Sequence, residues 1–375
     1  MNLKAAAHAQ KDAYLASLKE LVRLESPTSV KSANDKVADY LQTFLAQEGW
    51  QVERVSKAEV GDQLIARYGA DGQVRTLILC HFDTVWPLGT LEKMPLLEED
   101  GKLKGPGTMD MKAGIMTAIY ALKVAKAQGK TLKGPVTLLL TSDEEKGSDH
   151  SRLLIEQEAK AHDRVLVLEP GRDDGALKIA RKGIGGFWVD FKGISAHAGN
   201  NPKDGASALR ELAHFLLFAE SLTDYDKGTT VNVTVAQAGT VSNVICEEAN
   251  CEIDMRAETL AEAERVEKAI FAYQPKDSRV KIMVEGGINR PPMEFTEQNK
   301  ALFAELENYM KALDISLEAV MVGGGSDGNF TSALGVATID GLGSAGAGAH
   351  ARHEHIRIEE TLDRLALVTA LVSEL

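Results

Sequence analysis

Apolar residues near the start of the chain repeat at the spacing of an amphipathic helix. Leu15, Leu18 and Leu21 form one apolar stripe, and a second stripe follows further along. A Ser-Pro-Thr segment at residues 26–28 separates them, and proline disfavours a continuous helix there. The pattern therefore predicts two helices within residues 5–47.

Short apolar runs then alternate with helical patterns. The runs at residues 76–80, 136–141 and 165–168 are almost continuously apolar, as in strands buried on both faces of a sheet. Further expected elements are strands at residues 52–55 and 63–68 and helices at residues 110–128 and 151–162. This alternation predicts an α/β sheet with helices on both faces.

The pattern changes after Gly183. The expected order is strand, helix, two strands, helix and strand, with strands at residues 186–192, 230–238, 250–257 and 280–285 and helices at residues 204–223 and 259–273. This is the split βαβ order, in which the two internal strands pair as a hairpin. A helix at residues 297–313 and a strand at residues 336–340 then return to the first sheet. We therefore predict a discontinuous domain, residues 1–183 plus 294–375, with residues 184–293 inserted.

Composition narrows the function classes. The 375 residues include 42 basic and 55 acidic side chains, giving a formal net charge of −13. Nucleic acids and anionic membranes attract basic surfaces, so neither is an expected partner. The three cysteines are too few and too scattered for a disulfide framework. The first residues show no signal peptide, and no apolar run has transmembrane length, so we expect a cytoplasmic protein, or a periplasmic one if a signal was removed.

Metal-type ligands stand at the ends of these elements. The candidates are His81, Asp110, the acidic cluster Asp143-Glu144-Glu145, Glu169 and His350. Ligands of α/β sheets collect beyond the carboxyl ends of the strands. Imidazoles and carboxylates suit zinc, and cobalt or manganese fit similar sites. Together, these residues are typical of a site for two divalent metals.

Each candidate also has an ordinary interpretation. Asp110 precedes a predicted helix, where a lone aspartate is usually an N-cap. The acidic cluster alone would be a solvated turn, and His81 a polar residue at a strand end. Asp83 favours the metal site, because residues two apart in an extended segment point the same way. Its carboxylate is therefore expected to accept a hydrogen bond from His81 and to orient the imidazole.

Five segments, in this order, resemble the M20 metallopeptidases, and within them the glutamate carboxypeptidase (carboxypeptidase G2-like) branch. They are His81-Phe82-Asp83-Thr84-Val85, Gly105–Lys112, Asp143–Ser148, Glu169-Pro170 and Gly348-Ala349-His350. The resemblance covers essentially the whole chain. It implies a zinc-exopeptidase-like catalytic domain, with a mixed sheet between helices. It also implies an inserted ferredoxin-like α+β lid and dimerisation domain.

The resemblance assigns roles to the candidates. Two zinc ions per subunit would be held by a bridging Asp110, by His81 and Glu169 at one site, and by Glu145 and His350 at the other. Glu144 would be the general base and acid for a water activated between the metals, and Asp83 would orient His81. The peptide bond between Asp110 and Met111 would be cis.

The inserted domain carries further implied residues. His197, in Ser195-Ala196-His197-Ala198-Gly199, would reach the active site of the second subunit of a homodimer, and Asn243 would assist it. The other implied substrate-binding residues are Arg256, Arg290, Gly324 and Gly325. Guanidinium groups bind carboxylates through two hydrogen bonds, which agrees with the roles of the two arginines. Without the resemblance, a surface ion pair would be the better interpretation of each arginine.

The expected function is therefore a dinuclear zinc hydrolase that removes a C-terminal amino acid, in the first place glutamate. Its substrates would be N-acyl or peptidyl compounds, folate-type conjugates included. The segment Ala351-Arg352-His353 departs from the carboxypeptidase pattern and leaves specificity open. The alternatives are an N-acyl amino acid deacylase or dipeptidase of the same family and a non-catalytic binding homologue. A structural oligomer is disfavoured by the ordered spacing of the ligands.

Overall fold

The computed structural model describes residues 2–69 and 72–374; residues 1, 70–71 and 375, which the predicted catalytic domain includes, lie outside it. Contacts between Cα atoms divide the chain into two compact units. Unit 1 comprises Met1–Ala180, Phe295–Met321 and Ser326–Leu375, and unit 2 comprises Arg181–Glu294 and Val322–Gly325. Unit 2 is thus formed mainly by one continuous stretch within the sequence of unit 1.

A six-stranded mixed sheet forms the centre of unit 1, in the order β1-β2-β6-β3-β7-β14. The strands are β1 (Gln51–Val55), β2 (Gln63–Tyr68), β3 (Thr76–His81), β6 (Val136–Thr141), β7 (Arg164–Val167) and β14 (Ala337–Ile339). Strands β6, β3, β7 and β14 run parallel, whereas β1 and β2 pair antiparallel at one edge. Every residue of β3 and β6 is buried, as their continuous apolar sequences predict.

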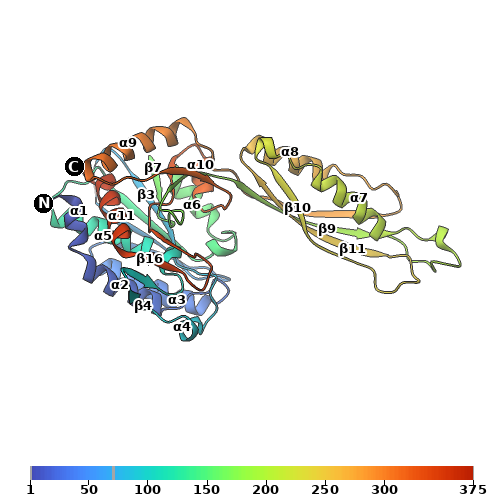
Figure 1. Ribbon diagram of the computed structural model, residues 1–375, viewed down its shortest axis with the longest axis horizontal. Coiled ribbons are helices and arrows are strands. Elements are labelled where there is room, and N and C mark those ends of the chain that lie inside the picture. Colours follow the sequence, from blue (N-terminus) through green and yellow to red (C-terminus); the bar gives the residue numbers. More distant parts are fainter. Residues whose placement is uncertain (1, 70–71, 375) are drawn as a thin grey trace. The chain divides into compact units, whose positions relative to one another are not determined.

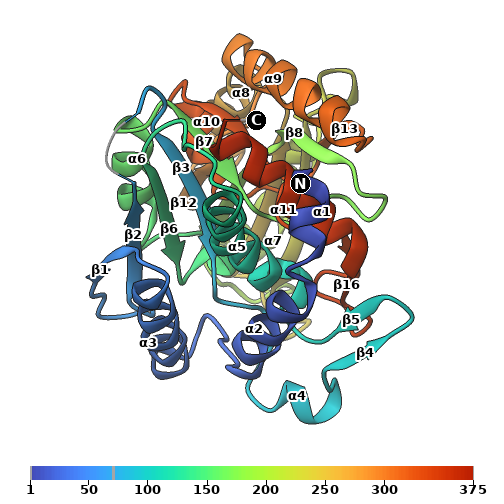
Figure 2. The same cartoon turned by 90° about the vertical axis from the view of Figure 1, so that its left-hand side faces the viewer.

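Helices cover both faces of this sheet. One core contains apolar residues of α1 (Leu3–His8), α2 (Lys11–Arg23), α3 (Lys31–Gln47), α5 (Ala113–Ala127), α9 (Glu297–Leu313) and α11 (Ile358–Val372). Figure 2 shows α5 in front of the sheet, with α11 beside it. The other face is covered by α6 (Arg152–Lys160) and α10 (Gly328–Ala333). Across the described residues, none of the helices is both long and apolar enough to span a bilayer.

The structure corrects several predicted elements in unit 1. The first predicted helix is in fact two helices, α1 and α2, separated by a short turn. The apolar stripe continues across this turn, so the sequence does not reveal the break. Helix α5 begins at Ala113, after an irregular turn at Thr108–Lys112. The unpredicted helices are α4 (Thr90–Lys93), α10 and the longer α11. The unpredicted strands form a sheet β15 (Gly346–Ala347)-β16 (His355–Arg357)-β5 (Lys102–Lys104)-β4 (Leu97–Glu99) and the pair β13 (Ala319–Val322)-β8 (Leu177–Arg181). Most of these are too short to show a period.

Unit 2 is a four-stranded antiparallel sheet with two helices on one face (Figure 1). Its strands are β9 (Gly183–Lys192), β10 (Thr230–Ala238), β11 (Glu248–Ala257) and β12 (Lys281–Arg290), in the order β10-β11-β9-β12, and its helices are α7 (Ala208–Glu220) and α8 (Leu260–Phe271). The predicted hairpin of the two internal strands is confirmed, since β10 pairs antiparallel with β11. The mixed α/β fold with an inserted sheet-rich unit is likewise confirmed.

Candidate metal centre

Three neighbouring parallel strands bring the candidate ligands to one edge of the unit 1 sheet. His81 is the last residue of β3, and Glu169 follows β7 by two residues. Glu144 and Glu145 lie in the 3-10 turn after β6. Because β6, β3 and β7 are adjacent and parallel, their carboxyl ends meet at the same edge.

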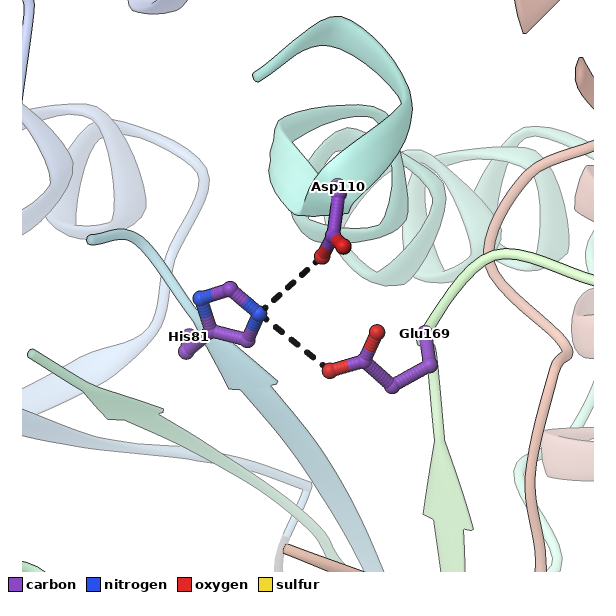
Figure 3. Close-up of side chains that lie close together, drawn as sticks. All are labelled: His81, Asp110 and Glu169. Atoms are coloured by element: carbon purple, nitrogen blue, oxygen red, sulfur yellow. Dashed lines mark hydrogen bonds and ion pairs between the residues drawn. The ribbon is translucent and has the colours of Figure 1, made fainter. Parts of the chain in front are cut away.

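The first group of side chains consists of His81, Asp110 and Glu169 (Figure 3). The Nε2 atom of His81 lies 3.2 Å from Oδ1 of Asp110 and 3.2 Å from Oε1 of Glu169. The imidazole is buried, and the other two side chains are nearly so. One nitrogen and two carboxylate oxygens thus converge on one point, an arrangement that suits a divalent cation.

The second group shares Asp110 and adds Glu145 and His350. The Nε2 atom of His350 lies 3.1 Å from Oε2 of Glu145 and 3.4 Å from Oδ2 of Asp110. The other carboxylate oxygen of Glu145, Oε1, is buried and has no hydrogen-bond partner among the residues that the structure describes. A buried acceptor without a donor is costly, and a cation would satisfy it.

The pKa values of these groups reflect their mutual charges. Burial lowers the pKa of His81, but Glu169 and Asp110 raise it well above its ordinary value. Asp110 and Glu145 raise the pKa of His350 to about 11. Burial, followed by the charge of Asp110, raises the pKa of Glu145 to about 7. Protons thus offset the clustered carboxylates here, and a divalent cation would take over that role, so the donor set fits a metal.

Asp83 links the two parts of the site. Its Oδ1 atom lies 3.3 Å from Nδ1 of His81, the ring nitrogen that faces away from Asp110. The same buried carboxylate accepts hydrogen bonds from the backbone N–H groups of Glu144 and Glu145 and from Oγ1 of Thr28. The backbone carbonyl oxygen of Asp83 also lies 3.0 Å from Nδ1 of His81. Asp83 thus contacts both the imidazole and the turn that follows β6, a position that is compatible with the orienting role expected for it.

Glu144 lies beside the first group but belongs to neither. Its Oε2 atom is 4.0 Å from Nε2 of His81, and its side chain is 12% exposed. The neighbouring Glu145 instead contacts His350. The structure thus separates the two adjacent glutamates into different positions. The peptide bond between Asp110 and Met111 is cis, as the resemblance implies.

Sequence reasoning missed Glu354. Its fully buried carboxylate accepts hydrogen bonds from the backbone N–H groups of Gly107, Met109 and Asp110 and from the indole of Trp86. Burial raises the pKa of Glu354 to about 7, against the opposite effect of these N–H donors. The only feature of the sequence that could have suggested Glu354 as a site residue is that it closely follows His350.

Two of the predicted lid residues lie together in unit 2. The segments that contain His197 and Asn243 pair, and the N–H of Ala198 donates to the carbonyl of Asn243 over 2.9 Å. The exposed His197 ring accepts two hydrogen bonds at Nδ1, from the N–H groups of Gly199 and Asn200. Since Nδ1 is an acceptor, the proton of the neutral ring is on Nε2, which can then act as a donor.

The two predicted arginines occupy one row of the unit 2 sheet. Arg256 of β11 and Arg290 of β12 both pair with Ile184 of β9, one from each side. A Cβ atom on Gly325 would lie 2.7 Å from Cδ1 of Ile184 and 3.0 Å from Cδ of Arg290, so this glycine permits a close approach. Arg290 is 3% exposed.

Two other contacts qualify the predicted roles of these residues. Arg256 forms hydrogen bonds with Asp254 through Nε and Nη2. The carbonyls of Gly324 and Gly325 accept hydrogen bonds from Arg181. At these two glycines the carbonyl oxygens are therefore engaged with Arg181.

Comparison with known proteins gives one consistent result. The sequence model of the family described as "Peptidase family M20/M25/M40" matches residues 77–374 of this chain. Carboxypeptidase G2 of Pseudomonas sp. (strain RS-16) is 32% identical, over 99% of this chain and 91% of its own. Succinyl-diaminopimelate desuccinylase of Ectopseudomonas mendocina (strain ymp) is 27% identical, over 93% of this chain and 94% of its own. The crystal structure of aminopeptidase PepT from Bacillus cereus ATCC 10987 has a similar fold, with a TM-score of 0.78 and 21% identity. The match covers 96% of this chain and 98% of the PepT chain.

Proposed function

The chain belongs to peptidase family M20/M25/M40 and is a metallopeptidase. On this premise, we propose that it uses two metal ions to release a C-terminal amino acid, in the first place glutamate. The bond broken is the amide of an N-acyl or peptidyl substrate. Zinc is the proposed metal, with cobalt or manganese as alternatives, because each group of ligands combines one imidazole with two carboxylates.

The arrangement of Asp110 carries this proposal. Its two carboxylate oxygens face different histidines, Oδ1 towards His81 and Oδ2 towards His350. A carboxylate that divides its oxygens in this way is suited to bridge two cations about 3.5–4 Å apart. Glu169 then completes the first site and Glu145 the second. A purely structural ion-pair cluster would not require one acid to be shared between two separate groups.

Bound metals would lower the pKa of a water molecule and polarise the scissile carbonyl. Glu144 is the proposed general base: it accepts the proton of the attacking water and passes it to the leaving nitrogen. Its position beside His81 but outside both ligand groups supports this role. The hydrogen bond from its backbone N–H to Asp83 would keep its carboxylate in place.

His197 is the proposed donor to the oxyanion that forms on the substrate, acting in the active site of a second copy of the chain. The two backbone N–H groups that occupy Nδ1 support it, because they leave the proton on Nε2. Asn243, whose backbone is hydrogen-bonded to the same segment, is the proposed second contact. Hydrogen-bond donors aimed at a developing oxyanion are among the larger contributions to catalysis.

The homodimer required for this role is proposed to form through unit 2. Strand β10 is an edge strand, with β11 as its sheet neighbour in the described structure. Beside it, helix α7 exposes Leu209 and Leu217 at 50% and 70%. Exposed leucines next to an edge strand favour association, and a second copy supplies both a matching strand and a matching apolar helix.

Arg256 and Arg290 are the proposed ligands of the substrate carboxylate. Their shared row on the sheet and the contact of Arg290 with the loop at Gly325 support a common site. A second candidate function is hydrolysis of N-acyl amino acids or dipeptides without preference for glutamate. The pairing of Arg256 with Asp254 favours it, because part of the guanidinium is already engaged.

A substrate panel tests the proposal. The protein is reconstituted with zinc and given N-acyl amino acids and dipeptides that differ only in the C-terminal residue. We expect the highest kcat/KM for C-terminal glutamate, with loss of activity when its α-carboxylate is amidated. Equal rates for all C-terminal residues would support the deacylase or dipeptidase alternative. Activity on the amidated substrates would contradict the carboxylate requirement.

A further inference from the structure

Glu354 lies between the two loops that carry Asp110 and His350. Its Oε1 atom accepts hydrogen bonds from the N–H groups of Met109 (2.9 Å) and Asp110 (3.1 Å). Its Oε2 atom accepts from the N–H of Gly107 (2.9 Å) and from Nε1 of Trp86 (2.8 Å). All four partners are donors, so an ionised carboxylate matches the position and satisfies every bond.

The backbone of Glu354 ties the same two loops together. Its carbonyl accepts a hydrogen bond from the N–H of Gly105, at the start of the Asp110 loop. Strand β16 follows directly and pairs with β5, which precedes that loop. Strand β15 pairs with the other edge of β16, so these two strands form a hairpin and the His350 loop connects them. Glu354 is the last residue of that loop, directly before β16.

Both loops have backbone conformations that need support. His350 has a φ of +62°, in the left-handed region that non-glycine residues seldom adopt. Gly107 has a φ of +70°, and a Cβ atom there would lie 2.7 Å from Cγ2 of Thr84. Such conformations persist only where surrounding contacts hold them. Glu354 supplies contacts of this kind to the Asp110 loop with its side chain and to both loops with its backbone.

We propose that Glu354 is a positioning residue, whose carboxylate fixes the Asp110 loop relative to the His350 loop and so sets the geometry of the shared metal ligand. The claim that Glu354 holds the Asp110 loop rests on hydrogen bonds alone. The claim that it affects metal binding rests also on the proposed function. Asp83 holds His81 and the Glu144–Glu145 turn in a comparable way. Two buried carboxylates would thus organise different segments of the centre.

Glu354→Gln is the variant that tests this role. Whichever way the amide is turned, its nitrogen faces two of the four N–H donors, so two hydrogen bonds are lost and replaced by repulsive contacts. Glu158→Gln is the matched control, since Glu158 is also buried in unit 1 but receives its hydrogen bonds from Arg67. Glu354→Asp keeps the charge but is too short to reach both pairs of donors, and it serves if the glutamine variant does not fold.

Two measurements are compared for each variant. Hydrogen exchange of the metal-free protein, followed on peptides that span residues 105–112, reports on the loop. Chelator competition with zinc reports on the affinity and number of bound metals. We expect faster exchange in Glu354→Gln and zinc binding weakened about 10- to 100-fold at one or both sites. The aspartate variant should fall between it and the wild type, and Glu158→Gln should match the wild type.

Exchange at residues 105–112 that stays at the wild-type rate in the position 354 variants would overturn the proposal. So would faster exchange with unchanged zinc affinity, because Glu354 would then act only on the loop. If the wild type itself binds fewer than two metals, the proposed function fails. The exchange comparison then still decides whether Glu354 holds the loop, independently of metal.

Discussion

The Nδ1 atom of His81 lies 3.3 Å from Oδ1 of Asp83, while its Nε2 atom faces Asp110 and Glu169. Nδ1 also lies 3.0 Å from the backbone carbonyl oxygen of Asp83. Both acceptors favour a proton on Nδ1, which would leave Nε2 for a metal. Asp83 is fully buried and accepts three further hydrogen bonds, from the N–H groups of Glu144 and Glu145 and from the hydroxyl of Thr28. It therefore influences both ligand segments at once.

The first prediction concerns this pair. Asp83→Asn should weaken zinc binding by about 10- to 100-fold, because an amide can no longer accept every bond made to the carboxylate. The measurement is competition with a chelator at constant pH. Thr28→Val is the matched control, since it removes one donor to Asp83 and leaves the contact with His81 intact. A variant Asp83→Asn that binds zinc like the wild type would show that metal binding does not depend on the Asp83 carboxylate, and that the backbone carbonyl of residue 83 is sufficient to orient His81.

The second prediction separates the adjacent glutamates. Glu144→Gln should retain both metals and lose activity by about 10²- to 10⁴-fold in kcat, because it removes only a proton acceptor. Glu145→Gln should instead weaken the binding of one metal, since Glu145 contacts His350. Metal content and steady-state kinetics of the two variants provide the comparison. Near-wild-type turnover by Glu144→Gln would exclude it as the general base.

The third prediction concerns the action of His197 across a dimer. His197→Ala should lower kcat by about 10²- to 10³-fold, as expected for the loss of an oxyanion donor. Mixing inactive His197→Ala subunits with inactive Glu144→Gln subunits, followed by exchange of subunits, should restore activity. In a two-fold dimer, about a quarter of the active sites would then combine an intact Glu144 with an intact His197 from the second copy. The absence of any rescue, with exchange verified, argues that His197 does not act in trans.

The fourth prediction concerns stability and pH, at a position remote from the proposed metal ligands. Burial raises the pKa of Asp62, but hydrogen bonds from Lys31, the N–H of Lys57 and Arg54 bring it below its ordinary value. The carboxylate is therefore more acidic folded than unfolded. Its contribution to stability is present above the unfolded pKa and is lost as the pH falls through the folded pKa.

Asp62→Asn should accordingly lower the free energy of unfolding by about 2 kcal/mol near neutral pH, the scale of hydrogen bonds to charged groups. The difference from the wild type should shrink as the pH falls below about 4, the ordinary value for aspartate. Urea unfolding at several pH values measures it. A difference that is constant over pH would mean that the ion pairs of Asp62 do not account for its contribution.

Much of the fold was predictable because the central strands are almost continuously apolar runs. Strands β3, β6 and β7 are buried on both faces, so their sequences mark them clearly, and the residues that follow them could be assigned to one edge of the sheet. The ligand candidates His81 and Glu169 come directly from this reasoning. The short strands β15 and β16 have two and three residues, which is too few to show any alternation.

Glu354 was not predictable for a different reason. It accepts a hydrogen bond from Met109, 245 residues away in the sequence, and buried backbone donors leave no trace in local composition. The same holds for the start of helix α5. The sequence around Asp110 favours a helix, but the irregular turn at Thr108–Lys112 delays its beginning to Ala113. Tertiary contacts, which local propensity does not contain, decide both features.

The number and place of bound metals test the central claim most directly. Crystals of the zinc-loaded protein, measured at the zinc absorption edge, should give two anomalous peaks per chain on either side of Asp110. One peak should contact His81 and Glu169, and the other Glu145 and His350. A single peak, or peaks that do not involve Asp110, would contradict the account of a two-metal hydrolase bridged by this carboxylate.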